Sequence, residues 1–267
     1  VRVLVSAGNH DSGERLASCH ELLSEAGLYV AAHLTRECRK IMFEDTEIFL
    51  LPWITTERVR SVYPEYKEGI QTMEDAYRIV CDEIRKQFTQ GKRHILMAHA
   101  FLTNAQTCDS DFSAVVGHAA CVGYQVFEGF DYVALGHIHK PQNIRPNIRY
   151  SGSPMKYSFG TEEKQEKSVT IIDTETMEQH LLPVSCLHER FTLEGTCKEL
   201  LEREYSEREK EAYVKVVLTD SYAGNEEREQ FRRIFPNLLE IRGKLLEKEE
   251  IHVSMTMEEL EEQQKDP

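Results

Sequence analysis

Three short apolar runs in this chain each end in polar residues that are typical metal ligands or proton carriers. The run "LVSAG" leads into Asn9 and His10, "ILMA" leads into His99, and "YVALG" leads into His137 and His139. Short apolar runs bounded by glycine or polar residues are typical of buried strands. Open α/β sheets place their sites beyond the carboxyl ends of such strands. We therefore expect an α/β fold in which these five side chains meet at one edge of the sheet.

The residue types in this set indicate metal-ion chemistry. Neutral imidazole and amide oxygen suit Mn²⁺, Fe²⁺ or Zn²⁺, and two ions about 3.5–4 Å apart can clamp an in-line phosphoryl displacement. His10 would then be a spare imidazole that donates a proton to the leaving alkoxide. In an extended chain His137 and His139 point the same way, and Gly136 lets the backbone come close to an ion. Asp11 fits the N-cap of the next helix better than a metal site.

Each motif has an ordinary structural explanation when it is taken alone. A His-x-His pair is often packed or solvated, Gly-Asn favours turns, and His99 after an apolar run also fits a core histidine. Because all three motifs follow the same order of strand and then ligand, we favour one shared site. The other histidines, the cysteines and Trp53 lack this context, and we interpret them as structural or surface residues.

The composition is that of a globular protein without a membrane span. Of the 267 residues, 40% are hydrophobic and 29% are charged, and no apolar run approaches the roughly 20 residues of a membrane helix. The seven cysteines form no Cys-x-x-Cys pair, which indicates reduced thiols and a cytoplasmic protein. The chain begins at Val1 inside a strand-like run, so we expect its natural start to be missing.

The charge is acidic overall but basic in one stretch. A net charge of −14 argues against a general nucleic-acid coat. Between Lys140 and Lys167, however, there are six basic residues and three acidic ones. This stretch is suited to binding phosphates, and a solvated loop face explains it equally well.

The remaining pattern predicts two α/β domains, at 1–185 and 186–267. In the first we expect strands, amphipathic helices and a hairpin in alternation. These are strands at 1–7 and 95–98 and within 131–136, a strand pair within 38–54, helices at 11–26 and 72–88, an irregular stretch at 102–129 and a hairpin that turns at 173–176. In the second we expect helix, strand, helix, strand, with a fraying end at 255–267.

The motifs "GNHD", "MAHAF" and "GHIHKPQ" resemble those of the calcineurin-like metallophosphoesterases. The loop "YSGSP", the hairpin "SVTIIDTETMEQHLLPV" and the segments "AYVKVVLTD" and "FPNLLEIRG" are similar to the DNA nucleases of that superfamily. The resemblance covers nearly the whole chain. It implies an α/β/β/α sandwich, incomplete at the N-terminus, with a small α/β capping domain at its C-terminal end.

The resemblance also implies two divalent cations, namely Mn²⁺, and roles for individual residues. Asn9, His99 and His137 would bind one ion, and His139 would bind the other. His10 would be the acid near the scissile phosphate.

The same resemblance implies DNA as the substrate. Phosphates would pass Lys140, Arg149 and the loop of Ser151, Gly152 and Ser153, whose backbone N–H groups can contact phosphate. The implied activity is ATP-regulated exonuclease and endonuclease cleavage of DNA ends and hairpins in repair, recombination and replication. The implied partners are an SbcC-type ATPase and a second copy of the chain, as a homodimer within a heterotetramer. The helices at 11–26 and 72–88 are the candidate dimer contacts.

One departure from the family pattern bears on activity. Family members carry an Asp-x-His and a Gly-Asp-x-x-Asp motif before "GNHD", and these supply most of one metal site and a bridging carboxylate. No carboxylate lies between Val1 and Gly8. Without the bridge two cations repel each other, and metal affinity falls. We predict that this chain binds at most one metal ion weakly and does not cleave DNA.

Two other functions are also compatible with the sequence. The chain could belong to a different binuclear metallophosphoesterase that acts on small phosphodiesters or phosphoproteins. It could also be a non-catalytic scaffold that holds DNA. The capping segment and the basic stretch favour the nuclease.

Overall fold

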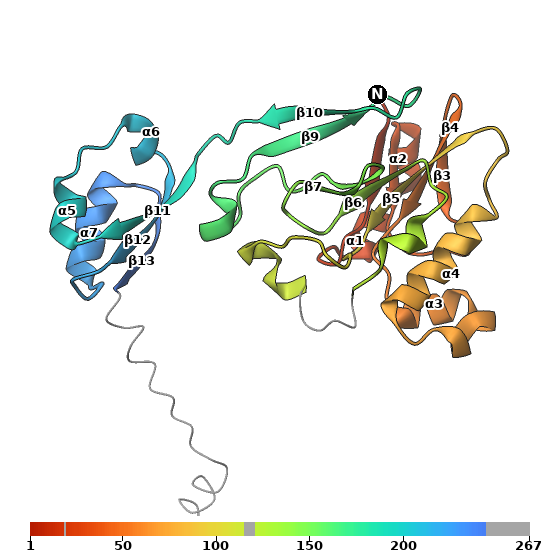
Figure 1. Ribbon diagram of the computed structural model, residues 1–267, viewed down its shortest axis with the longest axis horizontal. Coiled ribbons are helices and arrows are strands. Elements are labelled where there is room, and N and C mark those ends of the chain that lie inside the picture. The colour runs from red at the N-terminus through yellow and green to blue at the C-terminus, as the bar shows by residue number, and fades with distance from the viewer. Residues whose placement is uncertain (19, 115–120, 244–267) are drawn as a thin grey trace, which may run out of the picture. The chain divides into compact units, whose positions relative to one another are not determined.

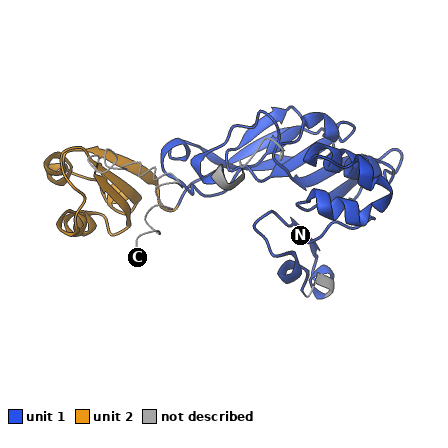
Figure 2. Cartoon of the chain, turned by 90° about the horizontal axis from the view of Figure 1, so that it is seen from below, with its two compact units in different colours: residues 1–186 blue, residues 187–267 orange. Residues whose placement is uncertain are grey.

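The computed structural model describes residues 1–18, 20–114 and 121–243 (Figure 1). The chain divides into two compact units, residues 1–186 and 187–267, coloured separately in Figure 2. Each unit has its own apolar core. The structure is therefore a mixed α/β fold with several sheets, and the two units are described one at a time.

A six-stranded sheet forms the centre of the first unit (Figure 1). Its order is β3-β4-β5-β6-β8-β7, in which β4, β5, β6 and β8 run parallel and the two outer strands run antiparallel to their neighbours. The strands are β3 (Arg39–Phe43), β4 (Thr46–Leu51), β5 (Arg93–His99), β6 (Tyr132–Gly136), β7 (Gln142–Arg145) and β8 (Ile148–Tyr150). The parallel centre explains why β4, β5 and β6 read as continuous apolar runs, because both faces of such strands are covered.

One helix packs on this sheet through an apolar stripe. Helix α4 (Met73–Arg85) begins at a capping box in which Thr72 and Asp75 each accept from the other's backbone N–H. It buries Tyr77, Val80 and Ile84 completely against the sheet core, and each such side chain contributes about 1.5–3 kcal/mol. The short helix α3 (Thr56–Val62) and the 3₁₀ turn η1 (Pro64–Gly69) precede it. The helix predicted at 72–88 is confirmed, three residues shorter at its end.

The first predicted motif lies on a separate two-stranded sheet. Strand β1 (Val3–Ser6) pairs in parallel with β2 (Leu28–Ala31). Two short helices, α1 (Gly13–Ala17) and α2 (His20–Glu25), replace the single helix predicted here. The expected N-cap was wrong, because Ser12 and not Asp11 accepts the capping bond from the Arg15 backbone N–H. The predicted stop is correct, since Gly27 has a φ of +85°.

The rest of the first unit is a hairpin and irregular chain. Strands β9 (Lys167–Ile172) and β10 (Gln179–Val184) form the predicted hairpin around Asp173. The described residues of the stretch predicted to be irregular form two 3₁₀ turns, η2 (Asp109–Ala114) and η4 (Tyr124–Phe127), and an isolated β-bridge between Leu102 and Val122. A further turn, η5 (Gly160–Glu162), precedes the hairpin. Positions 115–120 of the irregular stretch lie outside the described residues.

The second unit is a three-stranded parallel sheet, β11-β12-β13, with helices on its apolar side. Its elements are β11 (Arg190–Gly195), α5 (Cys197–Glu202), α6 (Glu207–Lys210), β12 (Tyr213–Leu218), α7 (Asn225–Ile234) and β13 (Leu238–Gly243). The predicted strands β12 and β13 and the helix α7 are present, and two short helices, α5 and α6, replace the first predicted helix. Strand β11 was not predicted and buries only Leu193. The end predicted to fray lies outside the described residues.

Two sequence expectations can be compared with the described part of the chain. None of its helices is long and apolar enough to span a membrane. The six cysteines within it are free thiols, while Cys19 lies outside it.

Candidate metal centre

The ends of β1, β5 and β6 bring three predicted ligands together. The Asn9 Oδ1 lies 2.8 Å from the His99 Nε2 and 3.2 Å from the His137 Nδ1, and the two ring nitrogens are 3.1 Å apart. Strand pairing explains the meeting, because β5 places His99 directly opposite Gly136 of β6. His10 and His139 line the same pocket, which has a volume of about 180 Å³.

Two glycines make room for the imidazole of His99. A Cβ on Gly8 would lie 2.6 Å from the His99 Cε1, and a Cβ on Gly136 would lie 3.0 Å from its Nδ1. Because Gly8 and Gly136 have no side chain, the imidazole of His99 fits between the segments that carry Asn9 and His137. The close approach of the Gly136 backbone to an ion stays a prediction.

The backbone at His137 also differs from the prediction. Its φ of +103° lies in the left-handed region and not in an extended strand, a conformation that is costly for a side chain with a Cβ. Ile138 is buried as expected. The two histidines line one pocket because the chain turns at His137, and not because it stays extended.

Burial favours the neutral form of His99 and of His137. Desolvation, followed by the neighbouring His137, lowers the pKa of His99 to about 4. Desolvation also lowers the pKa of His137. At pH 7 each neutral ring has one nitrogen with a free lone pair. The Tyr77 hydroxyl donates to the His99 carbonyl over 2.5 Å, which ties this strand end to α4.

These three atoms fit a divalent cation. Nitrogen and oxygen ligands bind such ions at about 2.0–2.2 Å, so three adjacent ligands of an octahedral ion lie about 3 Å apart. The separations of 2.8–3.2 Å match this spacing. An amide oxygen with two imidazole nitrogens also suits Mn²⁺, Fe²⁺ or Zn²⁺.

His10 and its neighbour Asp11 have different surroundings from the three atoms. His10 is exposed at the edge of the pocket. The Asp11 carboxylate accepts the Gly8 backbone N–H over 2.6 Å and so closes the turn that carries Asn9. Asp11 thus orients its neighbours, and Ser12 takes the helix cap.

His139 lies at the other end of the pocket in a hydrogen-bond chain. Its Nδ1 is 2.7 Å from the Ser110 Oγ, which donates to the Glu162 carboxylate over 2.9 Å. Its backbone N–H donates to Asp111 over 3.0 Å. If the Nδ1 carries the ring proton, the Nε2 keeps the lone pair.

A fully buried ion pair supports this chain of hydrogen bonds. The Lys167 Nζ lies 2.6 Å from Glu162 and also donates to the His139 carbonyl over 3.0 Å. Burial opposes the charge of Glu162, but the bond from Lys167 and those from Ser158 and Ser110 outweigh it and lower its pKa to about 2. The pair therefore stays charged and fixes the loop around His139.

The predicted phosphate-binding residues have mixed surroundings. Arg149 does not fit that role, because it is only 5% exposed and its guanidinium donates to Thr170 and Asn143. Ser153 is buried, and its backbone N–H donates to the His139 carbonyl. Lys167, in the basic stretch, is buried in its ion pair.

Three predicted positions remain near the surface. Lys140 is partly exposed and donates to the Gln106 side chain. Ser151 is partly buried beside Thr170. Gly152 has a φ of +77°, and a Cβ there would lie 2.7 Å from the His139 carbonyl oxygen, so the loop needs a glycine at this position. Its contact with phosphate stays a prediction.

Five residues that surround the ligands were not predicted from the sequence to belong to the site. These are Trp53, Ser110, Asp111, Glu162 and Lys167. Trp53 directly follows the Pro52 that ends the apolar run of β4, at the same edge as the other motifs, and this position was the signal available. The other four come from irregular chain and a strand start, where spacing gives no signal.

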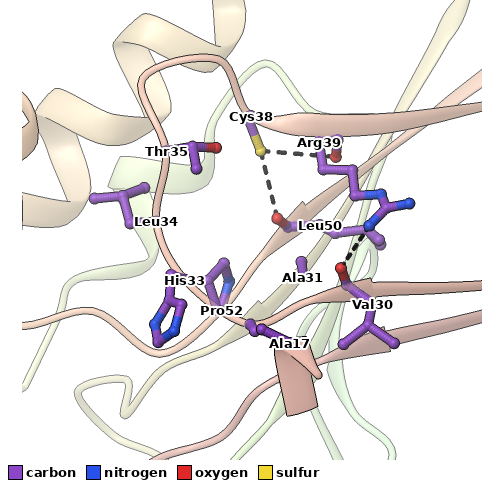
Figure 3. A pocket seen from close by; sticks show the side chains of 11 residues that line it. Ala17, Val30, Ala31, His33, Leu34, Thr35, Cys38, Arg39, Leu50 and Pro52 are labelled. Carbon is purple, nitrogen blue, oxygen red and sulfur yellow. Dashed lines mark hydrogen bonds between the residues drawn. The ribbon is translucent and has the colours of Figure 1, made fainter. Parts of the chain in front are cut away.

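A second pocket, of about 240 Å³, lies in the same unit (Figure 3). Its walls are mostly apolar and include Val30, Leu34 and Leu50. Two of its polar side chains are engaged, since the Cys38 thiol donates to the Leu50 carbonyl and Arg39 donates to the Val30 carbonyl. It is separate from the histidine pocket and shares none of its lining residues.

The fold and the site define an α/β protein in which two histidines and an asparagine meet beyond the ends of β1, β5 and β6. Comparison with known proteins shows which proteins the chain is similar to. The chain is 27% identical over 243 residues to the SbcD subunit of the nuclease SbcCD from Staphylococcus epidermidis, and 24% identical over 242 residues to the same subunit from Staphylococcus saprophyticus. Each match covers 90% of this chain and 64% of the relative.

A family model agrees with these matches. The SbcD_C family, described as the type 5 capsule protein repressor C-terminal domain, matches residues 189–266. The predicted resemblance to DNA nuclease subunits is therefore confirmed, and the chain is similar to the SbcD subunits over 90% of its length. It spans slightly less than two thirds of the length of these relatives.

Proposed function

We propose that this chain is the metal-binding part of a nuclease subunit that hydrolyses DNA phosphodiester bonds with an SbcC-type ATPase. The proposal includes an α/β/β/α sandwich capped by residues 186–267, and a homodimer within a heterotetramer that repairs DNA in the cytoplasm. The similarity to SbcD over 90% of the chain supports it. The observation that carries it is the triangle of Asn9, His99 and His137 atoms, because these residues lie far apart in sequence.

Asn9 and the four histidines of the pocket have proposed tasks. Asn9, His99 and His137 would hold one Mn²⁺, which when bound supplies a Lewis acid for a phosphoryl oxygen. His10 is exposed at the pocket edge, where it would donate a proton to the leaving alkoxide. His139, with its ring oriented by Ser110, would serve a second cation.

We further propose that the 267-residue chain binds one cation weakly and does not cleave DNA. A second site needs carboxylates, and the nearby ones are engaged. Asp11 accepts the Gly8 N–H, and Asp111 accepts from His139 and Cys108. Among the described residues that line the pocket, Asp111 is the sole carboxylate, so none is left free to bind a cation beside His139.

Titration of the chain with Mn²⁺ tests the proposal. We expect one site by calorimetry and by electron paramagnetic resonance, and no cleavage of a DNA hairpin. Two tight sites, or cleavage above the level of a His99→Ala variant, would contradict the proposal that this chain binds one cation weakly and does not cleave DNA. No Mn²⁺ binding at all would contradict the metal centre itself.

DNA binding separates the nuclease proposal from the small-substrate alternative. Binding of a hairpin should weaken steeply with added salt, because phosphate contacts release counterions. A chain that binds p-nitrophenyl phosphate esters and not DNA would favour the other metallophosphoesterase function.

A further inference from the structure

Trp53, the only tryptophan in the sequence, contacts all three segments that carry the triangle atoms. Its backbone N–H donates to the Ala7 carbonyl over 2.8 Å, just before the turn that carries Asn9. Its ring meets the ring of His99 edge-on, with centroids 5.8 Å apart and planes at 86°. It stacks on His137 with centroids 5.3 Å apart and planes within 15°.

The imidazole of His137 depends on such packing more than a usual ligand does. A metal-binding histidine commonly has its second ring nitrogen held by a carboxylate, carbonyl or water. The Nε2 of His137 is buried and finds no hydrogen-bond partner among the described residues. Its backbone is in the left-handed region, where a side chain persists only if its surroundings hold it. The Trp53 ring stacks on the imidazole of His137, and the ring centroid of Phe101 lies 5.9 Å from the centroid of that imidazole.

We infer that Trp53 is a positioning residue that holds His137 and His99 in the geometry that receives the cation. The inference rests on the proposed metal centre. Trp53 contacts no substrate or cation in this role, and it acts through the two imidazoles. Loss of an outer partner of a metal ligand typically weakens metal binding by about 10- to 100-fold.

Substitution of Trp53 tests this inference with a matched control. Trp53→Leu removes the ring and should weaken Mn²⁺ binding at least about 10-fold, measured by electron paramagnetic resonance. Trp53→Phe keeps a ring and should stay within about 3-fold of wild type, closer than the leucine variant. The control is Phe88→Leu, which removes the stack on His94 (3.7 Å, 2°) near the start of β5 and should leave Mn²⁺ affinity unchanged.

A spectroscopic readout separates positioning from general stability. Because Trp53 is the only tryptophan, its emission in wild type should be quenched by Mn²⁺ with the same midpoint as the resonance titration. In the metal-free protein, the ring protons of His137 should be shifted upfield by the stack, and this measurement holds even if Trp53→Leu does not fold.

The outcomes distinguish the two proposals. If wild type binds no Mn²⁺, both the metal centre and the role of Trp53 are overturned. If wild type binds and the folded Trp53→Leu binds equally well, only the role of Trp53 is overturned. An unshifted His137 ring in wild type overturns that role as well.

Discussion

At one end of the histidine pocket, three ligand-type atoms face one another across 2.8–3.2 Å. At the other end, His139 is already hydrogen-bonded to Ser110 and backed by the Glu162–Lys167 pair. The rings of Trp53 and Phe101 flank the first end. The second end has polar and charged groups around one aromatic ring, that of Tyr157. In the proposed centre a cation would complete the first end, whereas at the second end the protein already supplies a partner for the Nδ1 of His139.

The largest effect is expected from breaking the ion pair. Lys167→Met leaves the Glu162 carboxylate buried without its partner, and such a loss costs about 3–5 kcal/mol. Chemical denaturation should show this decrease in the free energy of unfolding. Adding Glu162→Leu should restore a large part of it, since a buried pair can be replaced by apolar residues. A loss below about 1 kcal/mol in the single variant would show that the second end is not held by this pair.

Acid should weaken the same end in a defined window. The folded-state pKa of Glu162 is lowered from 4.5 to about 2, so its carboxylate contributes stability that is fully present above pH 4.5. This stability is lost as the pH falls from 4.5 toward 2. Denaturation at several pH values should show a smaller acid-dependent loss in Glu162→Gln than in wild type. Equal slopes in the two proteins would contradict the ion-pair explanation.

The two ends should differ next in metal binding. His99→Ala removes one atom of the triangle and should weaken Mn²⁺ binding at least about 100-fold, or about 2.7 kcal/mol. His139→Ala should change the affinity less than about 3-fold, because His139 is not part of the triangle. Calorimetry measures both, with the exposed His180→Ala as the control. Equal losses at His99 and His139 would erase the distinction between the ends.

The smallest effect is expected at the glycines beside His99. A Cβ at position 8 would come within 2.6 Å of the ring, and one at position 136 within 3.0 Å. Gly8→Ala should therefore weaken Mn²⁺ binding by about 10-fold, or about 1.4 kcal/mol, and Gly136→Ala by less. Gly69→Ala is the control, since a Cβ there meets nothing within 4 Å. The reverse order at 8 and 136 would contradict this account of the glycines.

The sequence predicted the first end of the pocket better than the second. His99 and His137 follow neighbouring strands of one sheet, so their meeting at its edge could be predicted. Asn9 follows a strand of the separate two-stranded sheet, so its approach to them corrects the expectation of a single sheet edge. The hairpin and the helix after Thr72 could also be predicted, because turn and capping residues act on the residues next to them in the sequence. The overall class needed no long-range information beyond the alternation of strands and helices.

The second end could not be predicted because its contacts join distant irregular segments. Ser110 and Glu162 are 52 residues apart and lie in 3₁₀ turns. The basic stretch misled in the same way. Charge counting places Arg149 and Lys167 on a surface, whereas both are buried with specific partners. Burial of a charge depends on a partner that the local sequence does not show.

The triangle spans two different sheets, because β1 belongs to the two-stranded sheet and β5 and β6 to the six-stranded one. A cation held by all three atoms would bind only when the two sheets are docked. By mass action, every tenfold excess of free ion over its dissociation constant would add about 1.4 kcal/mol to that docking. Cation supply would thus set how firmly the N-terminal strand pair stays attached to the body of the protein.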